Sequence, residues 1–146
     1  MEKYNELRTV WSLLCGSSSI DHESNNISLY KIVEQLNLTK KPDAIIEDGA
    51  VSPAHLSYEF ITLLQRSGST DKKATYPTSM RIVDPTGKVM QELPVPAVFE
   101  EGMKRLRMRI DNDAVPITVA GEYQYQIVLD DIAEPLASTP LEVIIK

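Results

Sequence analysis

The side chains best suited to catalysis in this sequence are few and lie in short polar segments. The chain has one cysteine and two histidines. Cys15 is followed by three serines (17–19), Asp21 and His22, and the second histidine, His55, stands in another loop-like segment. A nucleophilic site needs a nucleophile, a base and an orienting acid within hydrogen-bond reach, but no Gly-x-Ser-x-Gly turn surrounds these residues. A small buried cysteine beside a solvated serine turn accounts for the same pattern, so we do not expect an enzyme.

Carboxylates offer a second kind of chemistry, which is calcium binding where strands end. Asp111 and Asp113, Asp130 and Asp131, and Asp84 all stand at expected strand ends. Calcium takes about six to eight oxygen ligands, so several loops would have to meet at one end of the molecule. Aspartate is also an ordinary turn residue. We keep calcium as an alternative, whereas zinc is not expected because cysteine and histidine pairs at ligand spacing are missing. The sequence predicts no cofactor.

A row of arginines is the most pointed feature of the sequence. Arg105, Arg107 and Arg109 alternate with apolar residues, and Lys104 precedes them. In a strand, such side chains share one face at intervals of about 6.6–6.8 Å. Guanidinium groups bind carboxylates and phosphates bidentately, so this arginine row is a candidate site for an anion or an acidic partner. Two structural alternatives remain: acids on a neighbouring strand, such as Glu122, neutralise the row, or the row discourages edge-to-edge aggregation.

Alternation of apolar and polar residues predicts strands along most of the chain. The segment Asp84–Gly87 has proline second and glycine fourth, which suits a type I turn inside a hairpin. The polar segment 67–73 is expected to be a loop. The expected strands are Leu7–Cys15, Tyr58–Leu64, Met80–Val83, Val89–Glu92, Arg105–Ile110, Tyr123–Leu129 and Leu141–Ile145.

The segment 27–38 is ambiguous between helix and strand. Leu29, Ile32, Val33 and Leu36 fit a helical stripe, but the same residues also divide between the two faces of a strand. We favour a strand that ends near Glu34.

Length and strand content together predict the fold. The chain has 146 residues, of which 42% are hydrophobic and 25% charged, as in a single globular domain with a sizeable core. Several short strands separated by turns favour an all-β fold. We therefore predict one domain over residues 1–146, a single antiparallel β-sandwich of about seven or eight strands, immunoglobulin-like in broad architecture.

Charge and hydropathy restrict the partners. Fifteen basic and 21 acidic residues give a net charge of −6, which disfavours nucleic acid and anionic membranes as default partners. No apolar run approaches the roughly 20 residues of a membrane helix, and the charged N-terminus does not have the form of a signal peptide. A single cysteine fits a reducing compartment. We expect a cytoplasmic protein.

Two stretches resemble known proteins. Leu14-Cys15, Ile20-Asp21, the segment 25–29 and the segment 32–36 are similar to the opening of a family of small bacterial and phage proteins without an assigned activity. In that family a cysteine-bearing strand and a Ser-Leu strand form the N-terminal hairpin. The order of the Asp84–Gly87 turn and the later Gly121-Glu122-Tyr123 also resembles immunoglobulin-like bacterial modules. The resemblance implies a β-sandwich of bacterial or phage origin and no particular activity.

The functional expectation is a non-catalytic interaction module. It would bind a protein partner, or a second copy of itself, through a sheet face or edge near Leu7–Cys15 or through the arginine row. Trp11 is either a core residue or an interface anchor. The alternative is a small-ligand sensor that binds calcium or an anionic metabolite at the loop end of the sandwich.

Overall fold

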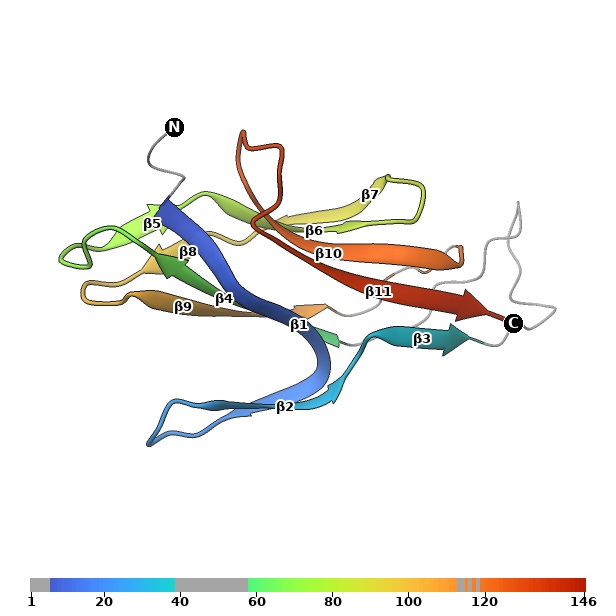
Figure 1. Cartoon of the computed structure of the whole chain (residues 1–146), viewed down its shortest axis with the longest axis horizontal. Helices are drawn as coiled ribbons and strands as arrows, with labels where there is room; N and C mark the ends of the chain where they lie inside the picture. Colours follow the sequence, from blue (N-terminus) through green and yellow to red (C-terminus); the bar gives the residue numbers. More distant parts are fainter. Residues whose placement is uncertain (1–5, 39–57, 113–114, 116, 118) are drawn as a thin grey trace.

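Two β-sheets pack face to face in the computed structural model, which describes residues 6–38, 58–112, 115, 117 and 119–146 (Figure 1). Sheet A has the strand order β2-β1-β4-β9, sheet B has the order β3-β11-β10-β6-β7, and β5 and β8 form a separate pair. Sheet A is built from β1 (Leu7–Ile20), β2 (Ile27–Ile32), β4 (Tyr58–Arg66) and β9 (Arg105–Asn112). Sheet B is built from β3 (Gln35–Leu38), β6 (Thr78–Val83), β7 (Val89–Pro94), β10 (Gly121–Leu129) and β11 (Ala137–Ile145). The pair consists of β5 (Ala74–Tyr76) and β8 (Ala97–Phe99).

One hydrophobic core lies between the two sheets. Every second residue of each central strand points into it, as the period of a half-buried strand requires. Phe60 of β4 meets Tyr125 of β10 edge to face, with ring centroids 5.9 Å apart, and both side chains are fully buried. The all-β sandwich, immunoglobulin-like in broad architecture, is confirmed.

The strand count and the pairing differ from the prediction in two respects. The described residues form eleven strands rather than seven or eight, because the short strands β3, β5 and β8 give too few alternations to stand out in the sequence. In addition, β3 pairs with β11 in parallel, whereas the other pairs are antiparallel as predicted. The described part of the chain contains no helix that could cross a membrane.

The ambiguous segment 27–38 is extended, and it serves both sheets. It begins as β2 in sheet A and continues as β3 in sheet B. Val33 and Glu34 make the crossing: the Val33 N–H donates to the Leu14 carbonyl (2.8 Å), and the Glu142 N–H donates to the Glu34 carbonyl (3.1 Å). The strand interpretation is confirmed, although the first strand ends at Ile32 and a second one follows.

Strand β1 also has two roles. Its first half pairs with β4, and its second half, from Cys15 onward, pairs with β2. The β1–β2 hairpin therefore leaves the sandwich and turns back beneath β9 (Figure 1). Opposite Gly16, Lys31 adopts a left-handed backbone with φ of 57°. A Cβ on Gly16 would lie 3.4 Å from that of Lys31, which shows how closely the two strands approach at the bend.

A buried arginine organises the loops beside the start of β9. Arg66 is 2% exposed, and its guanidinium lies 5.3 Å from the ring centroid of Phe99. Its side chain donates hydrogen bonds to four main-chain carbonyls, those of Thr70 (3.3 Å), Lys72 (2.8 Å), Glu100 (3.1 Å) and Met103 (2.8 Å). Buried polar groups are costly unless they are satisfied, so one cation holds two loops, 67–73 and 100–104, in a single arrangement.

Replacing this arginine should destabilise the protein strongly. Arg66→Met removes the donors while keeping much of the side-chain volume, and it leaves several buried carbonyls without partners. We expect the free energy of unfolding to fall by about 3 kcal/mol or more, measured by urea denaturation. Arg8→Met, at an exposed position, serves as the control and should change stability by no more than about 0.5 kcal/mol. Equal effects of the two substitutions would contradict the role given to Arg66.

Candidate functional site

The two surfaces that the sequence singles out lie on the same face of sheet A, the side turned away from sheet B. Strand β4 lies between β1 and β9, and its register with each of them places side chains in rows across this outer face. The rows are Arg8, Gln65 and Arg105; Trp11, Leu63 and Arg107; Leu13, Ile61 and Arg109; and Cys15, Glu59 and Asp111. The outer face thus joins an apolar centre to the arginine row along one side.

An irregularity in β1 adds a further arginine to this face. The register between β1 and β4 shifts between Thr9 and Trp11, as when one extra residue is inserted in a bulge. Without that shift, Arg8 and Trp11 would point to opposite sides, since strand side chains alternate. With it, Arg8 stands opposite Gln65 on the outer face. Sequence periodicity misses this residue because a bulge breaks the alternation.

The arginines of the row contact neutral hydrogen-bond acceptors or a carboxylate at a longer distance. Arg105 Nε donates to Gln65 Oε1 (2.8 Å), and an Arg109 nitrogen, Nη2, lies 3.7 Å from Glu59 Oε1. Arg107 Nη2 donates to the carbonyl of Asn25 at the hairpin tip (3.1 Å), while its Nε is buried without a hydrogen-bond partner. Much of the positive charge on this face is therefore not neutralised within the described chain.

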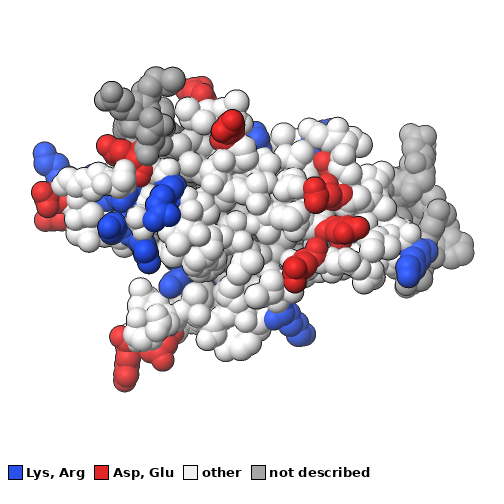
Figure 2. Space-filling view, in the orientation of Figure 1, with Lys and Arg blue, Asp and Glu red and all other residues white. Residues whose placement is uncertain are grey.

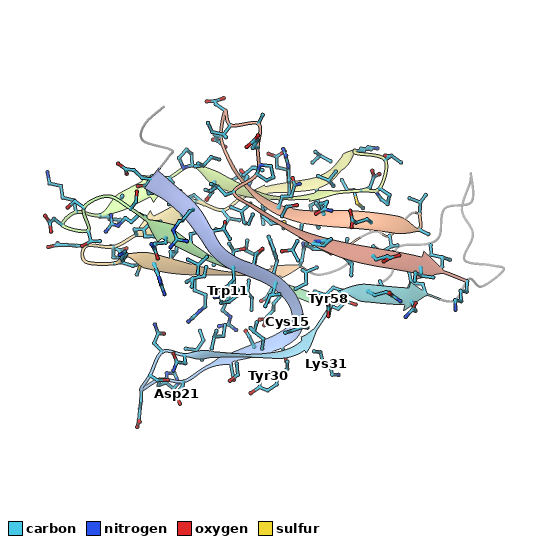
Figure 3. All side chains as sticks on the ribbon, viewed as in Figure 1. Trp11, Cys15, Asp21, Tyr30, Lys31 and Tyr58 are labelled. Atoms are coloured by element: carbon cyan, nitrogen blue, oxygen red, sulfur yellow. The ribbon has the colours of Figure 1, made fainter. Side chains whose placement is uncertain are left out.

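The apolar centre of the outer face is separate from the main core. Ile61 is fully buried, although it lies outside the hydrophobic cluster between the sheets. The β1–β2 hairpin covers part of this centre, and Ser18 Oγ near its base donates to Glu59. Trp11, Leu13 and Leu63 remain half-buried. Figure 3 shows Trp11 on the straight part of β1, with Cys15 at the bend.

The expected neutralisation of the row by Glu122 is wrong. Glu122 lies on β10 in sheet B, whereas the neighbour of β9 is β4, which carries the acid Glu59.

Lys104 lies just before β9, and its carbonyl accepts a hydrogen bond from the Arg66 N–H (3.0 Å). In Figure 2, basic side chains gather at the end of the molecule where β1 begins.

The calcium candidates are not brought together. Asp111 lies near the end of β9 in sheet A, whereas Asp130 and Asp131 follow the end of β10 in sheet B. Asp84 lies in the β6–β7 turn, where the Thr86 hydroxyl and backbone donors hold the pKa of its carboxyl below the usual range. Asp113 lies outside the described residues. No group of three potential ligands among the described residues could hold a metal ion.

Cys15 and His22, the candidate nucleophile and base, are also separated in the structure. Cys15 is fully buried at the base of the hairpin, whereas His22 is exposed in the turn beyond its far end. The five strand residues between Cys15 and Asp21 span about 17 Å. Burial raises the pKa of the Cys15 thiol, and the Glu59 carboxylate raises it further. Both effects disfavour the thiolate. His55 lies outside the described residues.

Known proteins resemble this chain only weakly. No protein-family model matches the chain, and no curated protein sequence does. Among solved structures, it is similar to the alkylpurine DNA glycosylase AlkC of Pseudomonas fluorescens bound to DNA containing an abasic site analogue: TM-score 0.48, 10% identity, covering 95% of this chain and 30% of that one. It is also similar to the immunoglobulin-like protein PA1606 of Pseudomonas aeruginosa: TM-score 0.41, 16% identity, covering 94% and 96%. The chain spans less than a third of the glycosylase.

The buried thiol leads to a prediction about its reactivity. A protonated thiol without solvent access reacts poorly, because the thiolate is the nucleophile. We expect iodoacetamide to alkylate native Cys15 about a hundredfold more slowly than the urea-unfolded protein, where the thiol is exposed and its pKa is lower. Intact-mass spectrometry over time measures both rates. Rapid alkylation of the native protein at neutral pH would show that the cysteine is accessible.

Proposed function

We propose that this protein is a non-catalytic interaction module that binds an acidic segment of a protein partner on the outer face of sheet A. The observation that carries the proposal is the row of Trp11, Leu63 and Arg107. An apolar anchor and a cationic side chain lie in one row across the sheet, with Leu63 between them. Fold similarity contributes nothing to this step, because a sandwich hosts many functions.

The side chains on this face are of the kinds that dominate binding energy at protein interfaces. Tryptophan and arginine are enriched among the residues whose truncation costs the most affinity, and they act best when surrounding groups exclude water. Trp11 is half-buried with Leu13 and Leu63 near it, and the hairpin stands along one side. The Arg107 guanidinium has N–H groups besides the one that it donates to the Asn25 carbonyl, and a carboxylate of the partner would accept from these.

Charge on this face sets the chemistry of the partner. Arg8 and the three arginines of the row share the face with two acids, Glu59 and Asp111, at its other end. The chain as a whole carries −6, so a partner is attracted locally to this end and repelled elsewhere. Such a distribution orients an acidic partner and speeds its association. A partner segment that carries carboxylates beside an apolar side chain matches the outer face of sheet A.

Charge reversal on the arginine row should weaken this binding. The probe is a fluorescein-labelled decapeptide that alternates Glu with Leu, and fluorescence anisotropy measures its affinity. We expect Arg105→Glu with Arg107→Glu to weaken binding at least about tenfold, which is about 1.4 kcal/mol, since attraction becomes repulsion. Trp11→Ala should weaken it by a similar factor, and 0.5 M salt should weaken the wild-type complex.

The matched control reverses two basic residues elsewhere. Lys88→Glu with Lys146→Glu changes the net charge equally but leaves the outer face of sheet A intact, so it should retain most of the affinity. Equal losses in both double variants would reduce the effect to net charge and refute the site. If inorganic phosphate or nucleotides raise the melting temperature and the peptide does not, the face binds an anionic metabolite instead.

A further inference from the structure

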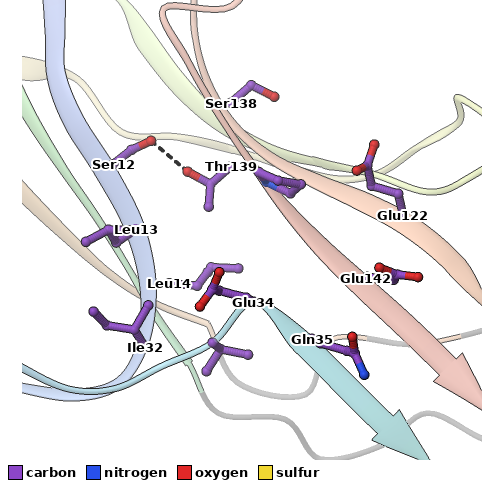
Figure 4. A pocket seen from close by; sticks show the side chains of 12 residues that line it. Ser12, Leu13, Leu14, Ile32, Glu34, Gln35, Glu122, Ser138, Thr139 and Glu142 are labelled. Atoms are coloured by element: carbon purple, nitrogen blue, oxygen red, sulfur yellow. Dashed lines mark hydrogen bonds between the residues drawn. The ribbon is translucent and has the colours of Figure 1, made fainter.

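A groove that is acidic, unlike the basic outer face of sheet A, lies on the open side of the sandwich, where the chain crosses from β2 to β3. Its volume is about 710 Å³, and β1 forms one wall while β11 forms the other (Figure 4). Two hydroxyl groups, Ser12 Oγ and Thr139 Oγ1, meet across it at 2.6 Å. We call this hollow the edge groove. Leu14, Val33 and Pro140 give it an apolar lining.

Both walls of the edge groove are strand edges with main-chain groups left to pair. The β2 ladder on β1 begins only at Cys15, and the β3 ladder on β11 begins only at Glu142. In a ladder, successive residues direct their main-chain groups to alternate sides. On β1, the Leu14 carbonyl points away from β4 and accepts from Val33, so the main-chain groups of Ser12, two residues earlier, point to the same side, toward the groove. On β11, the Glu142 N–H donates to Glu34, so the main-chain groups of Ser138, four residues earlier, also point toward the groove. These edges resemble those that accept an added strand.

Three carboxylates line the edge groove in an arrangement that costs stability. Glu122 and Glu142 lie directly opposite each other in the β10–β11 register, and like charges in that position repel. Glu34 lines the same hollow. Neither ion pair formed by the described residues involves any of the three, and Glu122 accepts a hydrogen bond from neutral Gln124. Figure 2 shows acidic side chains gathered over this side of the molecule.

We propose that the edge groove binds an extended, basic segment of another protein by strand addition to β11, in line with β3. The segment's main chain would pair with Ser138 and with the carbonyl of Pro140. Its lysine or arginine side chains would relieve the repulsion between Glu122 and Glu142. Apolar residues between them would cover the lining of the groove. This site lies apart from the outer face of sheet A and takes a partner of the opposite charge.

Main-chain pairing distinguishes this occupant from a simple cation. A metal ion or a polyamine would satisfy the carboxylates and leave the strand edges unchanged. An extended peptide uses both, and its affinity therefore depends on its own amide hydrogens as well as its charge. The experiment separates these two contributions.

The probe is a fluorescein-labelled octapeptide with lysine at alternate positions and valine or threonine between them. Fluorescence anisotropy compares it with the same peptide N-methylated at alternate amides. We expect Glu34→Gln/Glu122→Gln/Glu142→Gln to weaken binding at least tenfold and N-methylation to weaken it similarly. The control Glu23→Gln/Glu92→Gln/Glu134→Gln, an equal charge change at exposed acids elsewhere, should bind like the wild type.

A second measurement reports directly on the strand edge. Hydrogen exchange followed by NMR should show the Ser138 amide protected when the peptide is bound. Arg105→Glu with Arg107→Glu should leave the binding unchanged, so this proposal can fail or succeed independently of the one for sheet A. Equal affinity for the N-methylated peptide, displacement by spermidine or calcium with no protection of Ser138, or no loss of affinity in the triple variant at the groove would each overturn the proposal.

Discussion

The shape of this molecule depends on one strand that belongs to two ladders. Cys15 of β1 pairs with Glu59 of β4 on one side and with Ile32 of β2 on the other. Before Cys15, β1 forms its ladder with β4, and after it with β2. Gly16 follows at the bend, opposite Lys31 and its left-handed backbone. A change of partner at this one position sends the hairpin out of the sandwich.

Both candidate surfaces follow from that change of partner. Because β2 pairs only with the second half of β1, the first half keeps an open edge, and this edge becomes one wall of the edge groove. Because the hairpin turns back beneath β9, it brings the Asn25 carbonyl to Arg107. The crossing at Val33 and Glu34 then carries the chain to sheet B, where β3 covers only part of β11. If β2 paired with the whole of β1 and β3 with the whole of β11, neither candidate surface would be present.

Local patterns in the sequence predict most of the strands but few of their neighbours. The alternation in Arg105–Ile110 and Tyr123–Leu129 identifies β9 and β10, and the Asp84–Gly87 turn is confirmed by a hydrogen bond from the Gly87 N–H to the Asp84 carbonyl (3.0 Å). The partner of each strand is a long-range property. For that reason, Glu122 was assigned to the wrong neighbour, and the bulge that turns Arg8 to the outer face gave no signal.

Buried charge is equally hidden from local patterns. Arg66 ends a strand in the sequence as many surface arginines do, yet its guanidinium is enclosed by carbonyls from two loops that are distant in sequence. Burial in the folded protein, which local sequence does not reveal, also displaces the pKa of some groups. Burial raises the pKa of Tyr125 and of the Cys15 thiol, and both residues lie where solvent does not reach. On the surface, by contrast, the polarity is built from arginines, which stay charged at all ordinary pH values, and from carboxylates. Fixed charges arranged on rigid strands suit recognition of a partner, because they need no proton transfer to act.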